Sequence, residues 1–161
     1  MKFINIFIRL SIFYTTITFG QKIIYTKKYS SGNPKIISYY LTEGIDEVIE
    51  HEYFGSGSIK KEGIYQFGKK QGNWKTYYSN GSLRKKESFY NGKLNGRMTE
   101  WYQNGNKKIE GQFRKGKREG VFLFWEEDGS LHLKKSFVNG LKCLLIEYDK
   151  GSIVKSENYC G

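Results

Sequence analysis

Three stretches of equal length decide the fold of this chain. Residues 68–91 read GKKQGNWKTYYSNGSLRKKESFYN, residues 92–115 read GKLNGRMTEWYQNGNKKIEGQFRK, and residues 116–139 read GKREGVFLFWEEDGSLHLKKSFVN. Each opens on Gly-Lys, has a second glycine four residues later and carries Asn-Gly or Asp-Gly near its middle. A fixed period of 20 to 50 residues is typical of repeat proteins. The sequence therefore predicts a repeat architecture with a period of 24 residues.

Each repeat is expected to be a hairpin followed by a connector. Trp74 to Tyr78 and Leu83 to Tyr90 are the first two expected strands, and Asn80-Gly81 joins them. Asn-Gly supplies a positive φ at both central positions of a tight hairpin turn. The Gly-Lys-x-x-Gly segment is expected to form a wider turn into the next unit, because glycine again suits positive φ there.

The recurring order Gly-Lys-x-x-Gly, aromatic, Tyr-x-Asn-Gly, aromatic, Asn-Gly-Lys resembles the MORN repeat variant, over about Tyr53 to Gly140. Among proteins built from such repeats, the chain looks most like the bacterial antitoxin-type proteins of the YwqK family. The resemblance implies a protein-binding role of antitoxin or immunity type.

Composition agrees with one folded domain of short strands. The chain has 161 residues, 19 glycines and 17% aromatic residues, whereas disordered chains are poor in aromatics. The expected fold is all-β, an elongated antiparallel sheet of repeated hairpins. Residues 21–52 form an atypical first unit, residues 53–140 the clear repeats and residues 141–161 a capping hairpin, in which Leu144 replaces the second glycine.

Residues 1–20 have the pattern of an export signal. Lys2 and Arg9 give a basic start, Leu10 to Phe19 is mostly apolar, and small residues at Thr18 and Gly20 suit cleavage before Gln21. The alternatives are an uncleaved anchor and a buried first strand. With the signal, the protein is expected in the periplasm, at the cell surface or outside the cell.

The chain has two cysteines, Cys143 and Cys160. A turn at Lys150-Gly151 would place residue 143 opposite residue 158, with Cys160 diagonally nearby. A disulfide needs Cα atoms within about 7 Å, which this arrangement permits. Two free thiols at a frayed end remain the alternative.

The predicted register divides the side chains between two faces of the sheet. With a two-residue turn, Tyr78 would face Leu83 and Tyr77 would face Arg84. The first, packed face is mostly apolar and comprises Trp74, Tyr78, Leu83, Phe89, Met98, Tyr102, Ile109, Phe113, Phe122, Leu131, Leu133 and Phe137. A one-residue slip would exchange the two faces.

The second face, called the ladder face, presents one aromatic residue per repeat. This aromatic row is Tyr77, Trp101 and Trp125, and a two-strand unit should advance it by about 9.6 Å. Beside it we expect Arg84, Lys108 and His132, followed by Lys86, Glu110 and Lys134. Tyr, Trp and Arg are enriched at binding hot spots, so the row and these cations are the candidate partner-binding site.

The sequence lacks a recognisable catalytic or cofactor-binding set, so a non-enzyme without cofactor is expected. His51-Glu52 is without the second histidine of a metalloprotease motif, and the Gly-Lys pairs are not followed by Ser or Thr as in a phosphate-binding loop. Two cysteines 17 residues apart do not make a zinc site.

Three functions remain in competition. The first is occlusion of a protein partner, such as a toxin. The second is binding of an anionic glycan, lipid or other polyanion, which the formal charge of +11 would favour, although export argues against nucleic acid as the ligand. The third is a purely structural role, in which the aromatic row only stiffens the sheet through cross-strand pairs.

Overall fold

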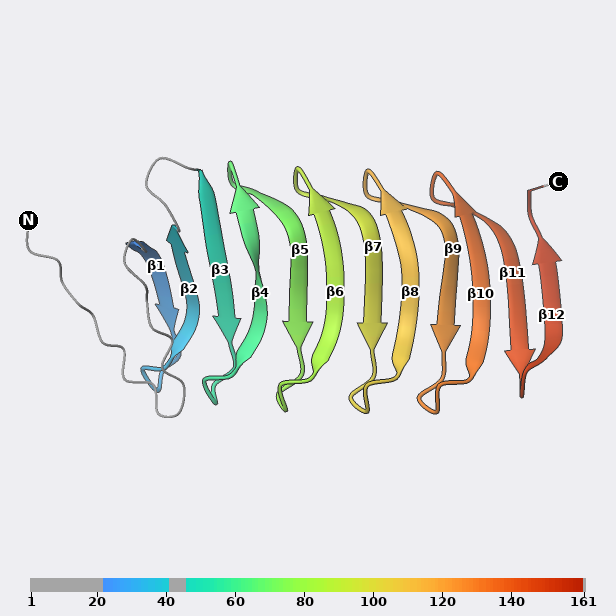
Figure 1. Cartoon of the computed structure of the whole chain (residues 1–161), viewed down its shortest axis with the longest axis horizontal. Coiled ribbons are helices and arrows are strands. Elements are labelled where there is room, and N and C mark those ends of the chain that lie inside the picture. The colour runs from blue at the N-terminus through green and yellow to red at the C-terminus, as the bar shows by residue number, and fades with distance from the viewer. Residues whose placement is uncertain (1–21, 41–45, 161) are drawn as a thin grey trace, which may run out of the picture.

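A computed structural model describes residues 22–40 and 46–160. These residues form twelve strands in one sheet, and the spatial order of the strands is their order in the chain (Figure 1). All neighbouring strands are antiparallel, so the predicted all-β sheet of consecutive hairpins is confirmed. The expected export signal at residues 1–20 lies outside the described residues.

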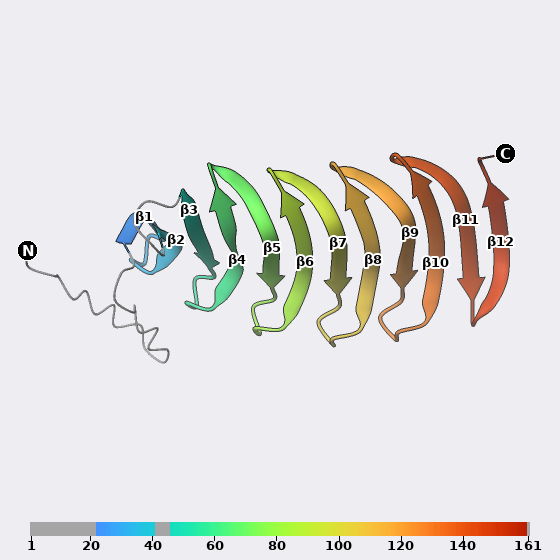
Figure 2. The same cartoon turned by 45° about the horizontal axis from the view of Figure 1, so that its top comes forward.

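The strands are seven to nine residues long. They are β1 (Lys22–Lys28), β2 (Pro34–Tyr40), β3 (Glu47–Tyr53), β4 (Ile59–Gln66), β5 (Lys69–Tyr77), β6 (Leu83–Tyr90), β7 (Lys93–Trp101), β8 (Lys107–Arg114), β9 (Lys117–Trp125), β10 (Leu131–Val138), β11 (Leu141–Asp149) and β12 (Ser152–Asn158). Figure 2 shows β4 to β12 side by side in one curved layer, with the β1–β2 hairpin rotated relative to them.

The turns at the lower end of the sheet in Figure 1 have three residues, not the two that were expected. In the β5–β6 turn, the Tyr78 N–H donates to the Ser82 carbonyl at 2.9 Å, and the Gly81 N–H donates to the Tyr78 carbonyl at 3.0 Å. Gly81 has a φ of 86°, whereas Asn80 does not have a positive φ. Asn80 instead accepts a hydrogen bond from the Ser82 N–H through Oδ1. This is a type I turn that ends in a left-handed glycine.

The upper turns are the tight two-residue turns. Tyr90 pairs with Lys93, and the intervening Asn91 and Gly92 have φ values of 51° and 79°, as a type I′ turn requires. The two turn types are therefore exchanged relative to the prediction. Each upper turn is also joined to the one before it: the Gly92 N–H donates to the Lys70 carbonyl at 2.9 Å, and the Gly116 N–H donates to the Leu94 carbonyl at 2.7 Å.

The extra turn residue shifts the register at the start of the second strand. Tyr77 pairs with Leu83, but Thr76 pairs with Lys85, so Arg84 is an inserted residue. The next two units repeat the shift, with Trp101 opposite Lys107 and Trp125 opposite Leu131. Leu83 and Leu131 therefore lie on the ladder face, and their assignment to the packed face was wrong.

The packed face holds the apolar core of the sheet. Trp74 and Phe122 are 2% and 1% exposed, and Met98 and Phe137 are also buried. The Phe122 ring makes edge-to-face contacts with Phe113 at 5.4 Å and with Phe137 at 5.2 Å between ring centroids. Such offset aromatic pairs add to the stabilisation from burial. Ile109 and Phe124 pack against this cluster.

The last hairpin is closed by a disulfide. The Cys143 and Cys160 sulfurs are 2.01 Å apart, with 4.8 Å between the Cα atoms. Leu144 pairs with Asn158, one residue away from the expected register, because the β11–β12 ladder shifts at Tyr148. The Tyr159 N–H donates to the Cys143 carbonyl at 2.7 Å. The end of the described chain is thus fixed to β11 by one covalent bond and one hydrogen bond.

Candidate functional site

The aromatic row lies on the ladder face, and all three rings are half-buried. Strand alternation places Tyr77, Trp101 and Trp125 on the side opposite to Trp74, Met98 and Phe122. The side chains between successive rings are Leu83 and Lys107, since these pair with Tyr77 and Trp101. The Lys107 Nζ lies 5.7 Å from the centroid of the Trp125 ring, so it spans the gap between two rings of the row.

The cations expected beside the row do not lie there. The Arg84 guanidinium is 5.6 Å from the Tyr78 ring centroid, and the Lys108 Nζ is 5.2 Å from that of Tyr102. His132 lies in the third equivalent position and contacts Glu126, with Nδ1 3.2 Å from Oε1. These three side chains cover the turn residues that follow β5, β7 and β9. The longer turn explains the difference, because it places Leu83, Lys107 and Leu131 opposite the rings of the row, where Arg84, Lys108 and His132 were expected.

The tyrosines at these turns brace neighbouring hairpins. The Tyr78 hydroxyl donates to the Trp101 carbonyl, and the Tyr102 hydroxyl donates to the Trp125 carbonyl, both at 2.8 Å. Each ring of the aromatic row after Tyr77 is therefore held at its backbone by the preceding unit. Burial is the main reason why the pKa of Tyr102 is raised.

The remaining predicted site residues share a row across the ladder face. Lys86 pairs with Thr99, Thr99 pairs with Glu110, and the pairing continues through Leu123 to Lys134. Lys86 is exposed, whereas Lys134 is half-buried. The structure thus brings Lys86, Glu110 and Lys134 to the same side of the sheet as the aromatic row and separates Arg84, Lys108 and His132 from it.

A polar cluster around Glu62 precedes the row. The Tyr77 hydroxyl donates to Glu62 Oε1 at 2.7 Å, and the Lys75 Nζ lies 3.1 Å from the same oxygen. The His51 Nε2 is 3.7 Å from Oε2. Burial acts to raise the pKa of the Glu62 carboxyl, but the hydrogen bonds from Tyr77 and Lys75 outweigh it, and the pKa is lowered. Burial together with the Glu62 hydrogen bond raises the pKa of Tyr77 to about 12.

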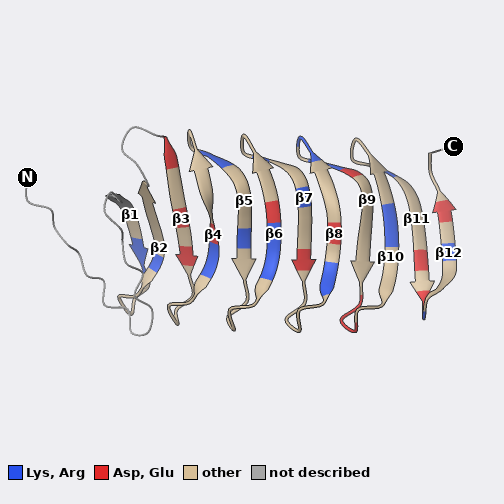
Figure 3. Ribbon diagram, in the orientation of Figure 1, with Lys and Arg blue, Asp and Glu red and all other residues tan. Residues whose placement is uncertain are grey.

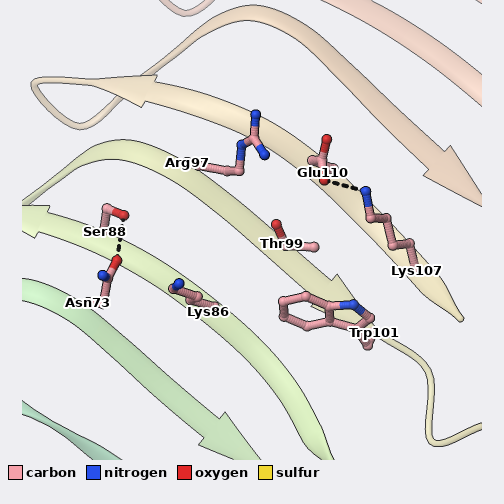
Figure 4. A pocket seen from close by; sticks show the side chains of 8 residues that line it. All are labelled: Asn73, Lys86, Ser88, Arg97, Thr99, Trp101, Lys107 and Glu110. Atoms are coloured by element: carbon pink, nitrogen blue, oxygen red, sulfur yellow. Dashed lines mark hydrogen bonds and ion pairs between the residues drawn. The ribbon is translucent and has the colours of Figure 1, made fainter. Parts of the chain in front are cut away.

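A shallow hollow of about 310 Å³ lies beside Trp101 on the ladder face (Figure 4). Its floor is Thr99, which is 6% exposed, and Trp101 forms one wall. On the β8 side, the Lys107 Nζ and Glu110 Oε2 form an ion pair at 2.7 Å. The lining residues are Asn73, Lys86, Ser88, Arg97, Thr99, Trp101, Lys107 and Glu110.

The upper turns carry a second cluster of exposed side chains, which we call the basic rim. Figure 3 shows Lys and Arg gathered at the β8–β9 turn, while acidic residues lie at the opposite, β9–β10 end. Phe67 in the β4–β5 turn and Leu141 at the start of β11 are 72% and 73% exposed at the same end of the sheet. The exposed cations of the basic rim are Lys69, Lys93, Arg114, Lys115 and Lys117.

Sequence reasoning missed several of these residues. Tyr53 occupies the position 24 residues before Tyr77 and pairs with Ile59 as Tyr77 pairs with Leu83, so the period could have extended the aromatic row by one ring. Arg97 and Thr99 carry no motif that would identify them. They line the hollow beside Trp101 only because of the side chains that the adjacent strands place next to them.

Across residues 22–40 and 46–160, no group of three or more His, Cys, Asp or Glu side chains is placed to hold a metal ion. Over the same part of the chain, no helix is long and apolar enough to cross a membrane.

Comparison with known proteins supports the repeat. Residues 70–91 and 94–115 match the MORN repeat variant family. Each matched stretch corresponds to one hairpin of the structure, β5–β6 and β7–β8. No curated protein matches the chain. The chain is thus a repeat sheet in which two successive hairpins are similar to the MORN repeat variant, and such a sheet fits a repeat binding module.

Proposed function

We propose that this protein is a non-catalytic binding module whose ladder face occludes a protein partner, in the manner of an antitoxin or immunity protein. The observation that supports this function is the aromatic row, half-buried and therefore partly accessible, on an open sheet face. Aromatic anchors with exposed cations beside them are typical of protein-binding hot spots. A protein surface can cover the whole row together with the hollow beside Trp101.

Partner capture from envelope and lysate fractions of the source organism tests this function. The bait is the purified chain, and the comparison is between the wild type, Trp101→Ala and Lys155→Gln. Lys155 lies in β12, away from the aromatic row. One protein retained by the wild type and by Lys155→Gln but lost with Trp101→Ala would support the proposal. Equal retention by all three baits would contradict a role for the ladder face.

We also propose that the protein acts outside the cytoplasm. The disulfide between Cys143 and Cys160 supports this, since such bonds form and persist in oxidising compartments. The test is mass spectrometry of the protein purified from its source after thiol alkylation. An N-terminus at Gln21 and unmodified cysteines are expected; an intact Met1 with two alkylated thiols would contradict export.

The basic rim favours a second candidate function, attachment to an anionic lipid surface. Its five cations have no carboxylate oxygen within 4.0 Å among the described residues, and Phe67, Tyr90 and Leu141 stand exposed at the same end of the sheet. Basic residues near an anionic membrane contribute about 1 kcal/mol each. The hydrogen bonds between successive upper turns keep these side chains in line.

Sedimentation with lipid vesicles tests the second candidate. Binding is expected with vesicles that contain phosphatidylglycerol and not with phosphatidylcholine alone. Lys115→Gln combined with Lys117→Gln should weaken binding more than tenfold, by about 1 kcal/mol per lysine. Lys155→Gln serves as the control. Equal binding to both kinds of vesicle would contradict an electrostatic attachment.

A further inference from the structure

We propose that the hollow beside Trp101 is a subsite for a carboxylate, supplied by an acidic side chain of the protein partner. This inference rests on the proposed function and specifies the chemistry that the partner must present. Lys86 and Arg97 would bind the carboxylate, and Trp101 would contact the apolar part of the acidic side chain. The hollow lies in the middle of the aromatic row, where an occluding surface would be centred.

The hollow exists because the middle unit departs from the repeat. The residues at equivalent positions in three successive units are Lys75, Thr99 and Leu123. Thr99 is the shortest of the three, and it forms the floor of the hollow. Its neighbours across the sheet are Lys86 and Glu110. A longer side chain at position 99, such as the leucine found at position 123, would fill the space.

The preceding unit shows how a carboxylate fits beside a ring of this row. There the carboxylate is the chain's own Glu62, which accepts from the Tyr77 hydroxyl at 2.7 Å and contacts the Lys75 Nζ at 3.1 Å. The residue one repeat after Glu62 is Lys86, and the one after Lys75 is Thr99. Next to Trp101, the position of the internal carboxylate is therefore occupied by a cation, Lys86, and the position of Lys75 by the shorter Thr99.

Two of the three positive charges around the hollow have no acidic partner among the described residues. Lys107 is neutralised by Glu110 at 2.7 Å. Lys86 and Arg97 are exposed, and within the described part of the chain neither has a carboxylate oxygen within 4.0 Å. Two unmatched cations on adjacent strands, one of them a forked guanidinium, suit an incoming carboxylate.

An NMR titration with two synthetic peptides tests the subsite directly. The probes are an end-blocked tetraglutamate and, as the uncharged control, an end-blocked tetraglutamine. Tetraglutamate is expected to shift the Trp101 indole N–H resonance in a saturable way, and tetraglutamine is not. Lys86→Gln combined with Arg97→Gln should weaken the tetraglutamate affinity by about tenfold, the loss of one charge-assisted contact or more.

Two further variants separate shape from charge. Thr99→Leu fills the hollow with the side chain found at Leu123 and keeps both cations, so it should also abolish the Trp101 shift. Lys93→Gln removes a charge from the same strand at the basic rim and should change the affinity less than twofold. The subsite is overturned if tetraglutamate does not shift Trp101, or if Lys93→Gln weakens binding as much as the double variant.

The same variants distinguish this inference from the proposed function. A partner captured by the wild type and lost with Trp101→Ala, but retained by Lys86→Gln with Arg97→Gln, would leave protein binding intact and overturn the carboxylate subsite. Failure to capture any partner would count against protein binding, while the tetraglutamate titration would still decide the subsite.

Discussion

The indole ring of Trp74 on β5 lies over Gly63 on β4, in the space where any other residue would have its Cβ atom. Phe122 on β9 covers Gly111 on β8 in the same way, two units further along. In the unit between them, Met98 stands opposite Glu87 instead. A large ring over a glycine thus alternates with a slimmer side chain over a larger residue, which lets a single-layer sheet bury aromatic rings on one side.

Gly63→Ala should therefore destabilise the protein, although it adds only one methyl group. The methyl would overlap the Trp74 ring, and overpacking of this kind lowers the free energy of unfolding by about 1–3 kcal/mol. Gly55→Ala is the matched control, because no atom lies within 4 Å of its added Cβ. Urea unfolding followed by circular dichroism measures both. Equal stabilities of the two variants would show that the sheet adjusts to the methyl group.

Trp101→Ala and Phe122→Ala should separate binding from stability. Phe122 is 1% exposed at the centre of the packed face, so its loss should cost about 3–5 kcal/mol of unfolding free energy. Trp101 is half-buried on the ladder face, and its loss should cost less while removing partner capture. Thermal unfolding and the capture experiment provide the two measurements. If Trp101→Ala unfolds the protein as much as Phe122→Ala does, the aromatic row is structural.

The disulfide should stabilise mainly the last hairpin. Cys143→Ser combined with Cys160→Ser is expected to lower the free energy of unfolding by about 3 kcal/mol, the chain-entropy value for a loop of this length. Hydrogen exchange should increase most in β12, which is an edge strand with mostly exposed side chains. Exchange in β5 to β8 should stay unchanged and serves as the internal control. A uniform increase over all strands would mean that the bond supports the whole sheet.

The hydrogen bond from Tyr77 to Glu62 predicts a loss of stability at high pH. The pKa of Tyr77 is raised from 10.0 to about 12, with burial as the largest cause. Because the folded state holds this proton more tightly, its contribution is complete below pH 10.0 and is lost as the pH rises toward about 12. The unfolding free energy of the wild type should fall over this interval by more than that of Tyr77→Phe.

Residue-specific NMR titration of Tyr77 checks the cause. In Glu62→Gln the Tyr77 pKa should move down toward its ordinary value of 10.0, since both the charge and the accepting carboxylate are removed. An unchanged Tyr77 pKa in this variant would assign the shift to burial alone.

The period of 24 residues was sufficient to predict the hairpin order and most of the packed face. Trp74, Met98 and Phe122 could be placed together because alternation along a strand fixes the side of each residue once the period is known. The turns were harder, since Asn-Gly occurs in both kinds of turn, as Asn80-Gly81 at the lower end and as Asn91-Gly92 at the upper end. The Asn80 side chain accepts a hydrogen bond from the Ser82 N–H, and Asn80 does not adopt a positive φ. The turn is therefore one residue longer than expected, and Arg84 is an inserted residue in the next strand.

The hollow could not be predicted by the same reasoning. A repeat pattern shows what the units have in common. The hollow arises where one unit differs from its neighbours, at Thr99 and Arg97. Its recognition needs the cross-strand pairing of Lys86 with Thr99, which depends on the register shifts on both sides of β6. Sequence alone therefore identified the aromatic row but not which of its rings has a neighbouring space.

The hydrogen bonds between successive upper turns also give the molecule an adjustable length. Each turn is joined to the one before it, as Gly92 is to Lys70 and Gly116 to Leu94. Removal of residues 92–115 would join Asn91 to Gly116 and recreate an Asn-Gly turn, so that Tyr77 and Trp125 become neighbours in the row. Insertion or deletion of whole 24-residue hairpins would therefore change the length of the ladder face in steps of one hairpin. The hydrogen bonds between successive turns would be the same at every length.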